Sequence, residues 1–235
     1  MSRNHSIECE KCNEDNHSVF GELEGANLKV INSNKICNVY KKGQTIFHEG
    51  NRPMGLYFIK KGKIILSKTG IKGREQIIRF AKEGDIIGYR ALISGDNYAA
   101  SAITLEDSSI CFIPQDYFLL LLDQNKMLSL KIMRQLAKDL EIAELQLTDM
   151  AQKPVRERTA KVLLLLEAYY GYKDDGKTLN VTLKREEIAN IVGTVTETLI
   201  RYLSEFKNEN IVDLDGKEIR IFDRSKLLKI ANNSG

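Results

Sequence analysis

The chain has 235 residues, with 35 basic against 32 acidic residues, and 43% of its residues are hydrophobic. This composition excludes a disordered chain and suits one large or two ordinary globular domains. The longest apolar run, Tyr117 to Leu122, is too short to span a bilayer, and Met1 to Asp15 is too polar for a secretory signal peptide. We therefore expect a cytoplasmic protein with no membrane partner and with reduced thiols.

Residues 1–27 form a polar N-terminal extension that carries the motif Cys9-Glu10-Lys11-Cys12. Three interpretations of this motif stay open. It is an incidental feature of a tail, or a zinc site completed by His5 and His17, or a redox pair in which Lys11 lowers a thiol pKa.

Residues 28–123 show short apolar runs separated by glycines, which is typical of strands joined by turns. The expected strands are Thr45–Phe47, Leu56–Ile59, Lys63–Leu66, Gln76–Phe80, Asp85–Ile87 and Ile110–Ile113. Parallel strands would need helical crossovers, for which this stretch has no room. We therefore predict an antiparallel jelly roll or β-roll, acting as a sensor domain.

Residues 124–153 change to a helical period. Apolar side chains recur at alternating spacings of three and four, in the order Met133, Leu136, Leu140, Ala143, Leu147 and Met150. The residues between them are mostly charged or amidic, so the stripe is narrow, as in a two-stranded coiled coil. The pattern favours a dimerisation helix between two copies of the chain. The alternative is that this face packs against the chain's own barrel.

Residues 154–235 are expected to form a separate small domain. A helix begins at Pro154 and runs from Val155 to about Tyr170, before a polar loop. Further along, the runs Ile211–Leu214 and Lys217–Phe222 flank Asp215-Gly216, which predicts a hairpin on a tight turn.

Between that helix and that hairpin lies a helix-turn-helix pattern. Arg185–Val192 predicts one helix, Gly193 ends it, and a second helix follows within a few residues. Thr194 is expected to be the N-cap of the second helix, with Glu197 completing a capping box. At about 100° per residue, the second helix has one apolar face, composed of Leu199, Tyr202, Leu203 and Phe206.

Glu197 and Arg201 fall on the opposite face of this helix, near its N-terminal end. Arginine donates two hydrogen bonds to guanine O6 and N7, and glutamate accepts from cytosine N4, so this pair suits a recognition helix in a major groove. The alternative is a solvated surface pair. If the second helix reads DNA, the hairpin that follows is a wing, and its Lys217 and Arg220 reach phosphates. Residues expected to face DNA are Thr194, Thr196, Glu197, Thr198, Ile200, Arg201, Lys217 and Arg220.

The predicted order of an α+β chain, with a β-roll first, then a long helix and a winged helix-turn-helix, resembles the family of the cyclic-AMP receptor protein and the fumarate–nitrate reduction regulator (the CRP/FNR family). Local matches support the resemblance at Lys42–Gly50, Gly55–Ile59 with Gly62-Lys63, and Glu187–Gly193 followed by Glu197-Thr198 and Arg201. The resemblance implies a bacterial homodimeric transcription regulator that binds a palindromic site on double-stranded DNA and contacts RNA polymerase. It also implies that Glu197 and Arg201 contact bases, with a different readout at Thr196.

The region that matches the family's effector pocket departs from the family pattern. Cyclic-nucleotide binders place a glutamate and an arginine over the ribose and the phosphate, whereas this chain has Tyr89 and Tyr98 near those positions. A buried phosphate without a cation partner is costly, so we expect an effector other than cyclic AMP. The expected pocket residues are Gly88, Tyr89, Arg90, Tyr98 and Ser101.

The resemblance also suggests an iron–sulfur cluster, because some members of this family hold one with four cysteines. Cys9, Cys12 and Cys111 resemble three of the ligands, Ser18 lies near the missing one, and Cys37 is the only other thiol. A buried, inert Cys111 is the alternative.

The alternative function is a ligand-sensing β-roll whose winged helix binds protein instead of DNA. It is open on sequence alone because Lys184 to Lys229 holds nine basic and nine acidic residues. An enzyme is not expected, because His48 is the only histidine in the β-roll region and Cys9 lies in a polar tail.

Overall fold

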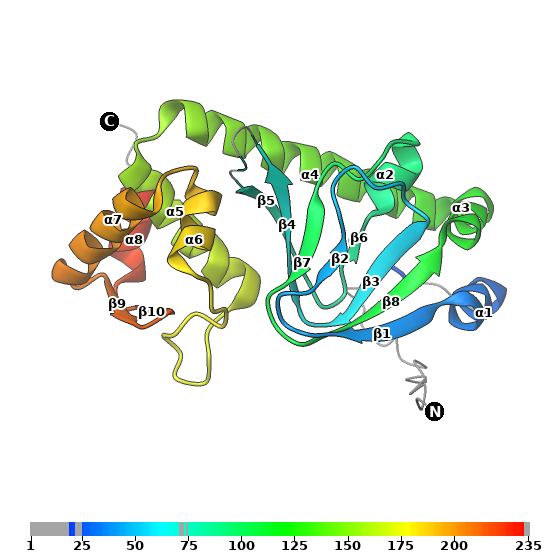
Figure 1. Ribbon diagram of the computed structural model, residues 1–235, viewed down its shortest axis with the longest axis horizontal. Coiled ribbons are helices and arrows are strands. Elements are labelled where there is room, and N and C mark those ends of the chain that lie inside the picture. Colours follow the sequence, from blue (N-terminus) through cyan, green and yellow to red (C-terminus); the bar gives the residue numbers. More distant parts are fainter. Residues whose placement is uncertain (1–18, 22–24, 71–72, 74, 233–235) are drawn as a thin grey trace. The chain divides into compact units, whose positions relative to one another are not determined.

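The computed structural model describes residues 19–21, 25–70, 73 and 75–232 (Figure 1). The chain divides into two compact units. Unit 1 comprises the described residues of Met1–Ile71 and Arg79–Glu141, and unit 2 those of Lys72–Ile78 and Ile142–Gly235. No helix in the described part of the chain combines the length and the apolar character needed to cross a membrane.

Unit 1 is built on two four-stranded sheets, with strand orders β1-β8-β3-β6 and β2-β7-β4-β5. The strands are β1 (Ile36–Tyr40), β2 (Thr45–Phe47), β3 (Gly55–Lys61), β4 (Lys63–Thr69), β5 (Glu75–Lys82), β6 (Ile86–Ile87), β7 (Ser101–Thr104) and β8 (Ser108–Pro114). The predicted antiparallel β-roll is therefore confirmed. The sequence prediction missed β1 and β7.

The first of these sheets is covered on both faces, which explains why β3 and β8 are apolar without strict alternation. On one face, Leu56, Phe58 and Cys111 pack against helices α1, α3 and α4. On the other face, Ile59 and Ile110 pack against the second sheet. These helices are α1 (Gly25–Asn34), α3 (Gln115–Gln124) and α4 (Lys126–Gln152), and the short α2 (Tyr89–Ser94) connects β6 to β7.

The connection between β3 and β4, which lie in different sheets, turns on the single residue Gly62. Its φ of 126° is open to glycine alone among common residues, and a Cβ there would lie 2.1 Å from Ser108 Oγ. The turn thus fixes the β3–β4 connection at a point where β8 passes close by.

Apart from the described residues of Lys72–Ile78, unit 2 is a winged helix-turn-helix that begins with the last part of α4. Its further elements are α5 (Val155–Tyr170), α6 (Arg185–Val192), α7 (Thr196–Asn208), β9 (Val212–Asp215), β10 (Glu218–Ile221) and α8 (Arg224–Ala231). The hairpin pairs Asp215 with Glu218, so its two turn residues are Gly216 and Lys217, one position later than predicted. The predicted order of helices and hairpin is otherwise confirmed.

Candidate nucleic-acid interface

The two helices of the helix-turn-helix are joined by a tight turn at Gly193. This glycine has φ 72° and ψ 49°, the left-handed conformation that ends a helix. Its N–H and that of Thr194 both donate to the carbonyl of Ala189, at 2.9 and 3.1 Å. Ile188, Ala189, Ile191 and Val192 bury the inner face of α6.

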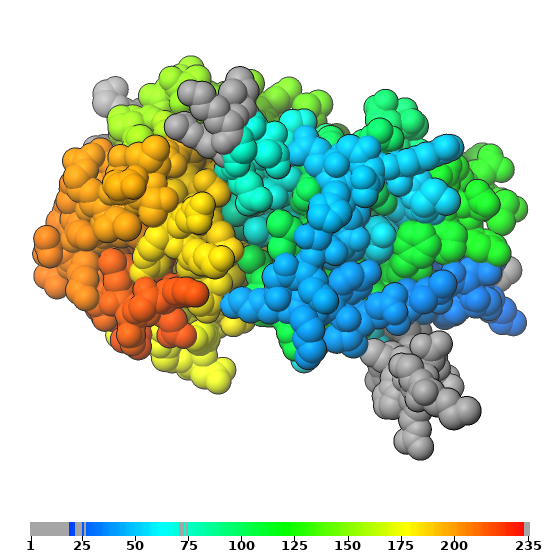
Figure 2. Space-filling view, viewed as in Figure 1, coloured from blue at the N-terminus to red at the C-terminus, as the bar shows by residue number. Residues whose placement is uncertain are grey.

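The helix α7 has a sharply divided surface. Leu199, Leu203 and Phe206 are completely buried. Glu197, Ile200, Arg201 and Ser204 are exposed, and the orange segment that holds α7 lies open at the surface (Figure 2). The predicted division into a core face and an outward face is present, with Tyr202 half-buried at the boundary.

The predicted cap of α7 is wrong. The helix begins at Thr196, its N-cap is Val195, and no side chain caps it. Thr194 instead belongs to the end of α6, because its N–H is bonded to Ala189. Glu197 is therefore the second helical residue and does not complete a capping box. Its carboxylate forms no hydrogen bond or ion pair with any other residue that the structure describes, and it lies where the helix dipole favours an anion.

Arg201 is held by its own helix and not by Glu197. Its side chain is 61% exposed, and its Nη1 lies 3.5 Å from Oε1 of Glu205. The guanidinium also stacks over the ring of Tyr202 at 4.4 Å. Exposed pairs at this spacing contribute only about 0.2–0.5 kcal/mol, so a guanine edge competes easily for the guanidinium.

The wing differs between its two predicted phosphate contacts. Lys217 is exposed at the turn. Arg220, in contrast, lies within 3.6 Å of Asp213 and 3.5 Å of Asp215, and its Nε donates to Thr178. Arg220 is thus already engaged by carboxylates, and Lys217 is the better placed of the two.

Sequence reasoning missed Arg185 in this interface. Its Nη2 donates to the carbonyl of Gly216 at 2.9 Å and so connects α6 to the wing turn. Burial lowers the pKa of this guanidinium. A basic residue in the first turn of a helix is unfavourable for the helix dipole. The position of Arg185 in the sequence could therefore have indicated that its side chain has a partner outside α6.

The expected effector residues do not line one pocket. Tyr89 is fully buried among the residues that face the helices, and its hydroxyl donates to Oδ2 of Asp139 on α4 at 2.7 Å. Tyr98 belongs to the other core cluster, stacks on Phe47 at 3.9 Å, and donates to the carbonyl of Gly55. The two tyrosines therefore lie on opposite faces of the same sheet.

The other expected effector residues are also separated. Gly88 lies beside Tyr98, since a Cβ on Gly88 would approach that ring to 3.2 Å. Arg90 is exposed, and Ser101 accepts a hydrogen bond from the N–H of Glu49 at 2.9 Å. Because Tyr89 and Tyr98 belong to different core clusters, the prediction of one pocket formed by all of these residues is corrected.

The cysteines that the structure describes do not fit an iron–sulfur cluster. Cys37 and Cys111 are directly opposite each other on β1 and β8 and form a disulfide. Their sulfurs are bonded to each other, so they do not supply two of the four thiolates that a cluster requires. The expectation of reduced thiols is wrong for this pair. Cys9 and Cys12, and the alternative zinc site with His5 and His17, lie outside the described residues.

The outward face of α7, the wing and the β-roll together define a class of protein, namely a winged helix-turn-helix DNA-binding regulator with a sensor unit. Comparison with known families agrees with this class. The cyclic nucleotide-binding domain matches residues 37–125, and the Crp-like helix-turn-helix domain matches residues 157–230.

Known proteins give the same result. The chain is 30% identical over 195 residues to the fumarate and nitrate reduction regulatory protein of Vibrio cholerae, covering 83% of this chain and 78% of that protein. It is 29% identical to a CRP-like cAMP-activated global transcriptional regulator of Mycobacterium tuberculosis, covering 82% of this chain and 86% of that protein. A crystal structure of a CRP/FNR-family regulator from Eubacterium rectale has the same fold, with a TM-score of 0.74, 21% identity, and coverage of 92% and 99% of the two chains.

The chain belongs to the CRP/FNR family of transcription regulators. It is therefore a DNA-binding regulator and not an enzyme. The alternative in which the winged helix binds only protein is not favoured.

Proposed function

We propose that the protein is a homodimer that reads a palindromic site on double-stranded DNA, with α7 of each copy in a major groove. The observation that carries this proposal is the outward pair on α7. Glu197 and Arg201 are both exposed, while Leu199 and Leu203 anchor the opposite face in the core. A helix with one anchored face and one open face with hydrogen-bonding side chains suits readout of base edges.

In this arrangement each side chain has a defined role. Arg201 gives up its exposed contact with Glu205 and donates to guanine O6 and N7. Glu197 accepts from cytosine N4 of a neighbouring pair. Thr194, Thr196, Thr198 and Ile200 flank this pair. Lys217 on the wing, with Arg220, contacts phosphates and sets the register of the protein on the duplex.

The dimer is supported by the apolar stripe on α4. Met133 is 57% exposed, Leu140 60% and Leu147 70%, and Ala143 and Met150 are exposed on the same stripe. Leu136 is an exception, since it packs partly against the core of unit 1. A row of exposed large apolar side chains marks an interaction surface, and its period fits a second copy of the same helix. Two recognition helices would then enter successive grooves about 34 Å apart.

The signal sensed by unit 1 is, in this proposal, not cyclic AMP. Tyr89 stands where a cyclic-nucleotide binder has its ribose-binding acid, and it is turned toward Asp139. To regulate DNA binding, the signal must bind one arrangement of the protein more tightly than another. A regulator of this kind works on chromosomal DNA in the cytoplasm and contacts RNA polymerase.

The test is a comparison of Arg201→Ala with Lys217→Ala. Each variant is titrated against the duplex that the wild-type protein selects from a random library, and against single-base variants of that duplex. Arg201→Ala is expected to cost about 1–3 kcal/mol on the selected site and to relax the preference at one base pair. Lys217→Ala is expected to weaken binding to all sequences equally. It is also expected to reduce the slope of log affinity against log salt concentration by about one. Equal loss on every sequence for Arg201→Ala would show that Arg201 contacts only phosphate.

A further inference from the structure

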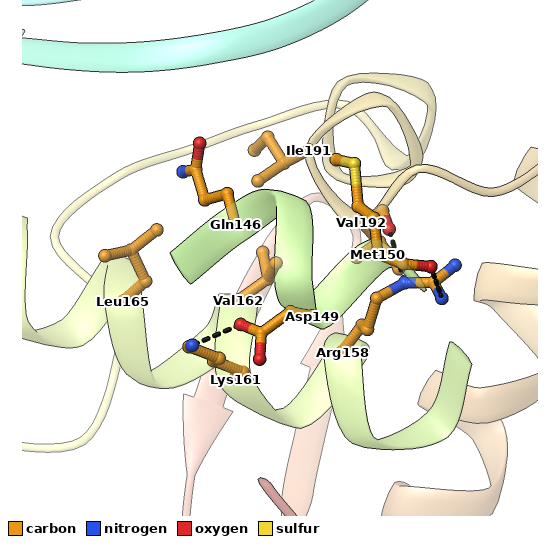
Figure 3. Close-up of a pocket in the computed structure, with 9 residues that line it drawn as sticks. All are labelled: Gln146, Asp149, Met150, Arg158, Lys161, Val162, Leu165, Ile191 and Val192. Atoms are coloured by element: carbon orange, nitrogen blue, oxygen red, sulfur yellow. Dashed lines mark hydrogen bonds and ion pairs between the residues drawn. The ribbon is translucent and has the colours of Figure 1, made fainter. Parts of the chain in front are cut away.

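Arg158 on α5 connects the ends of two other helices of unit 2 through backbone carbonyls (Figure 3). Its Nε donates to the carbonyl of Val192 at 3.0 Å, and its Nη2 to that of Gly193 at 3.2 Å. Both carbonyls lie at the turn between α6 and α7. Its Nη1 donates to the carbonyl of Lys153 at 2.7 Å and lies 3.4 Å from that of Met150, at the end of α4.

Only a guanidinium matches this geometry. The last carbonyls of a helix lack intrahelical partners and carry the negative end of the helix dipole, so a cation there is favourable. Arginine presents several N–H donors in a fixed planar fork, whereas lysine has one compact nitrogen. A single arginine can therefore hold the ends of α4 and α6 at once, and a lysine at Arg158 cannot.

Other contacts hold the same three helices together. Asp149 on α4 forms an ion pair with Lys161 on α5. The methyl group of Met150 lies beside Gly193, where an added Cβ would meet it at 3.4 Å. The end of α4 thus touches the turn of the helix-turn-helix directly.

A pocket lined mainly by apolar side chains also lies at this junction. It is a cavity of about 50 Å³, with Met150, Val162, Leu165, Ile191 and Val192 in its wall. Asp149 and Lys161 at this cavity are paired with each other, and Arg158 is committed to carbonyls. The hydrogen bonds of Arg158 therefore join these helix ends beside this apolar wall.

We propose that Arg158 is the positioning residue that fixes the α6–α7 turn, and with it the recognition helix, against the end of α4. Arg158 does not itself contact DNA. This inference rests on the proposed function, in which two copies pair through α4. The guanidinium then sets the distance and phase between the two recognition helices, and so the spacing of half-sites that the dimer accepts.

The test uses the full chain and the variants Arg158→Gln and Arg158→Lys. DNA duplexes carry either one half-site or two half-sites, taken from the sequence that the wild-type protein selects, with the spacer varied one base pair at a time. Arg158→Gln is expected to leave half-site affinity within about twofold, because the base-reading face of α7 is intact. Its affinity for the two-site duplex is expected to fall about tenfold, because the two recognition helices are no longer held at one separation. For the same reason it should accept a wider range of half-site spacings. The affinity of Arg158→Lys for the two-site duplex is expected to lie between those of the wild-type protein and Arg158→Gln.

Arg156→Gln is the matched control. Arg156 lies on the same helix, and its Nη2 pairs with Glu209 at 2.7 Å, beyond the C-terminal end of α7. Its other contacts are with Glu205 and the ring of Phe206 in the C-terminal half of α7. Among the described residues it forms no hydrogen bond or ion pair with α4, so its loss should leave the spacing preference unchanged.

Three results would overturn the inference. One is that Arg158→Gln has the same ratio of two-site to half-site affinity as the wild-type protein. Another is an equal fall on both duplexes, which would mean that Arg158 only stabilises the DNA-binding unit. The third is a monomeric Arg158→Gln by sedimentation, which would place its effect on dimerisation. If the wild-type protein itself shows no preference for two half-sites, the proposed dimeric function fails, and this is seen without any variant.

Discussion

In unit 1 the hydroxyls of Tyr89 and Tyr98 are buried and bonded to the protein itself, whereas in unit 2 Glu197 and Arg201 lie on the open surface of α7. The side chains on α7 can exchange their present contacts for a ligand. The two tyrosines of the β-roll are instead bonded within its core.

The difference has a physical basis. A buried polar group must be satisfied by a partner, and removing that partner costs more than the hydrogen bond itself contributes. Tyr89 and Tyr98 therefore stabilise the fold and are not available to a ligand. An exposed group such as Arg201 is in exchange with water, so a base edge replaces its present contact at little cost. Substitutions in unit 1 should consequently change stability first, and those on α7 should change DNA affinity first.

The largest effect on stability is expected from the disulfide of unit 1. Cys37 and Cys111 are separated by 74 residues, so their bond restricts a long loop in the unfolded chain. Cys37→Ala is expected to lower the free energy of unfolding by about 2–4 kcal/mol, measured by urea denaturation of the oxidised protein. Dithiothreitol should produce the same loss in the wild-type protein and no further loss in the variant. If the urea midpoint of the wild-type protein does not change when dithiothreitol is added, this prediction is contradicted.

Tyr89→Phe is expected to have the next largest effect. Asp139 accepts from Tyr89 at 2.7 Å, and its Oδ2 also lies 3.0 Å from Nη1 of Arg79. The variant removes one hydrogen bond to a charged acceptor but leaves the ion pair, so we expect a loss of about 1–2 kcal/mol in unfolding free energy. If Tyr89 were a ligand-binding residue, the variant would leave stability unchanged and alter the response to the signal.

The pH dependence of this loss provides its control. Burial raises the pKa of Tyr89 to about 12, above its ordinary value of 10.0. A raised pKa stabilises the fold fully below the unfolded value, and this stabilisation is lost as the pH rises through the folded value. The difference between the wild-type protein and Tyr89→Phe should therefore be constant up to about pH 10 and shrink between pH 10 and 12. A difference that stays constant to pH 12 would be inconsistent with a buried phenol.

The sequence predicted unit 2 better than unit 1, for a local reason. The outward face of α7 follows from helical periodicity, and the wing follows from a short turn motif, so neither depends on distant residues. The orientation of Tyr89 depends on Asp139, which lies 50 positions away on another helix. The disulfide depends on the register of β1 on β8, which spacing along the chain does not reveal.

The errors inside each unit have similar causes. β1 contains the polar Asn38 and lies at a sheet edge, so its apolar pattern is weak. The predicted start of α7 is one residue too early because Thr194 is a good N-cap by type, yet its N–H is used by the end of α6. Helix boundaries are set by such competition between adjacent turns.

The smallest expected effect comes from Asp175 in unit 2. Like the two tyrosines of unit 1, its polar group is hydrogen-bonded to the protein itself. The carboxylate accepts from the hydroxyl and the N–H of Thr178 and from the N–H of Lys177. These hydrogen bonds, that from the Thr178 hydroxyl first, lower the pKa of Asp175 to about 2. Asp175→Asn should therefore weaken the loop before α6 slightly, and a small fall in the thermal midpoint near neutral pH would show it.

The sign of the pH dependence distinguishes this role from a contact with DNA. A lowered pKa stabilises the fold above the unfolded value of about 4, and this stabilisation is lost as the pH falls through the folded value. The difference between the wild-type protein and Asp175→Asn should be constant above about pH 4 and shrink toward pH 2. An NMR titration of the Asp175 carboxyl measures the same pKa directly. Titration near the ordinary value, or a change in DNA affinity as large as that of Lys217→Ala, would show that polar residues in unit 2 cannot be divided into structural and DNA-reading groups by their present hydrogen bonds.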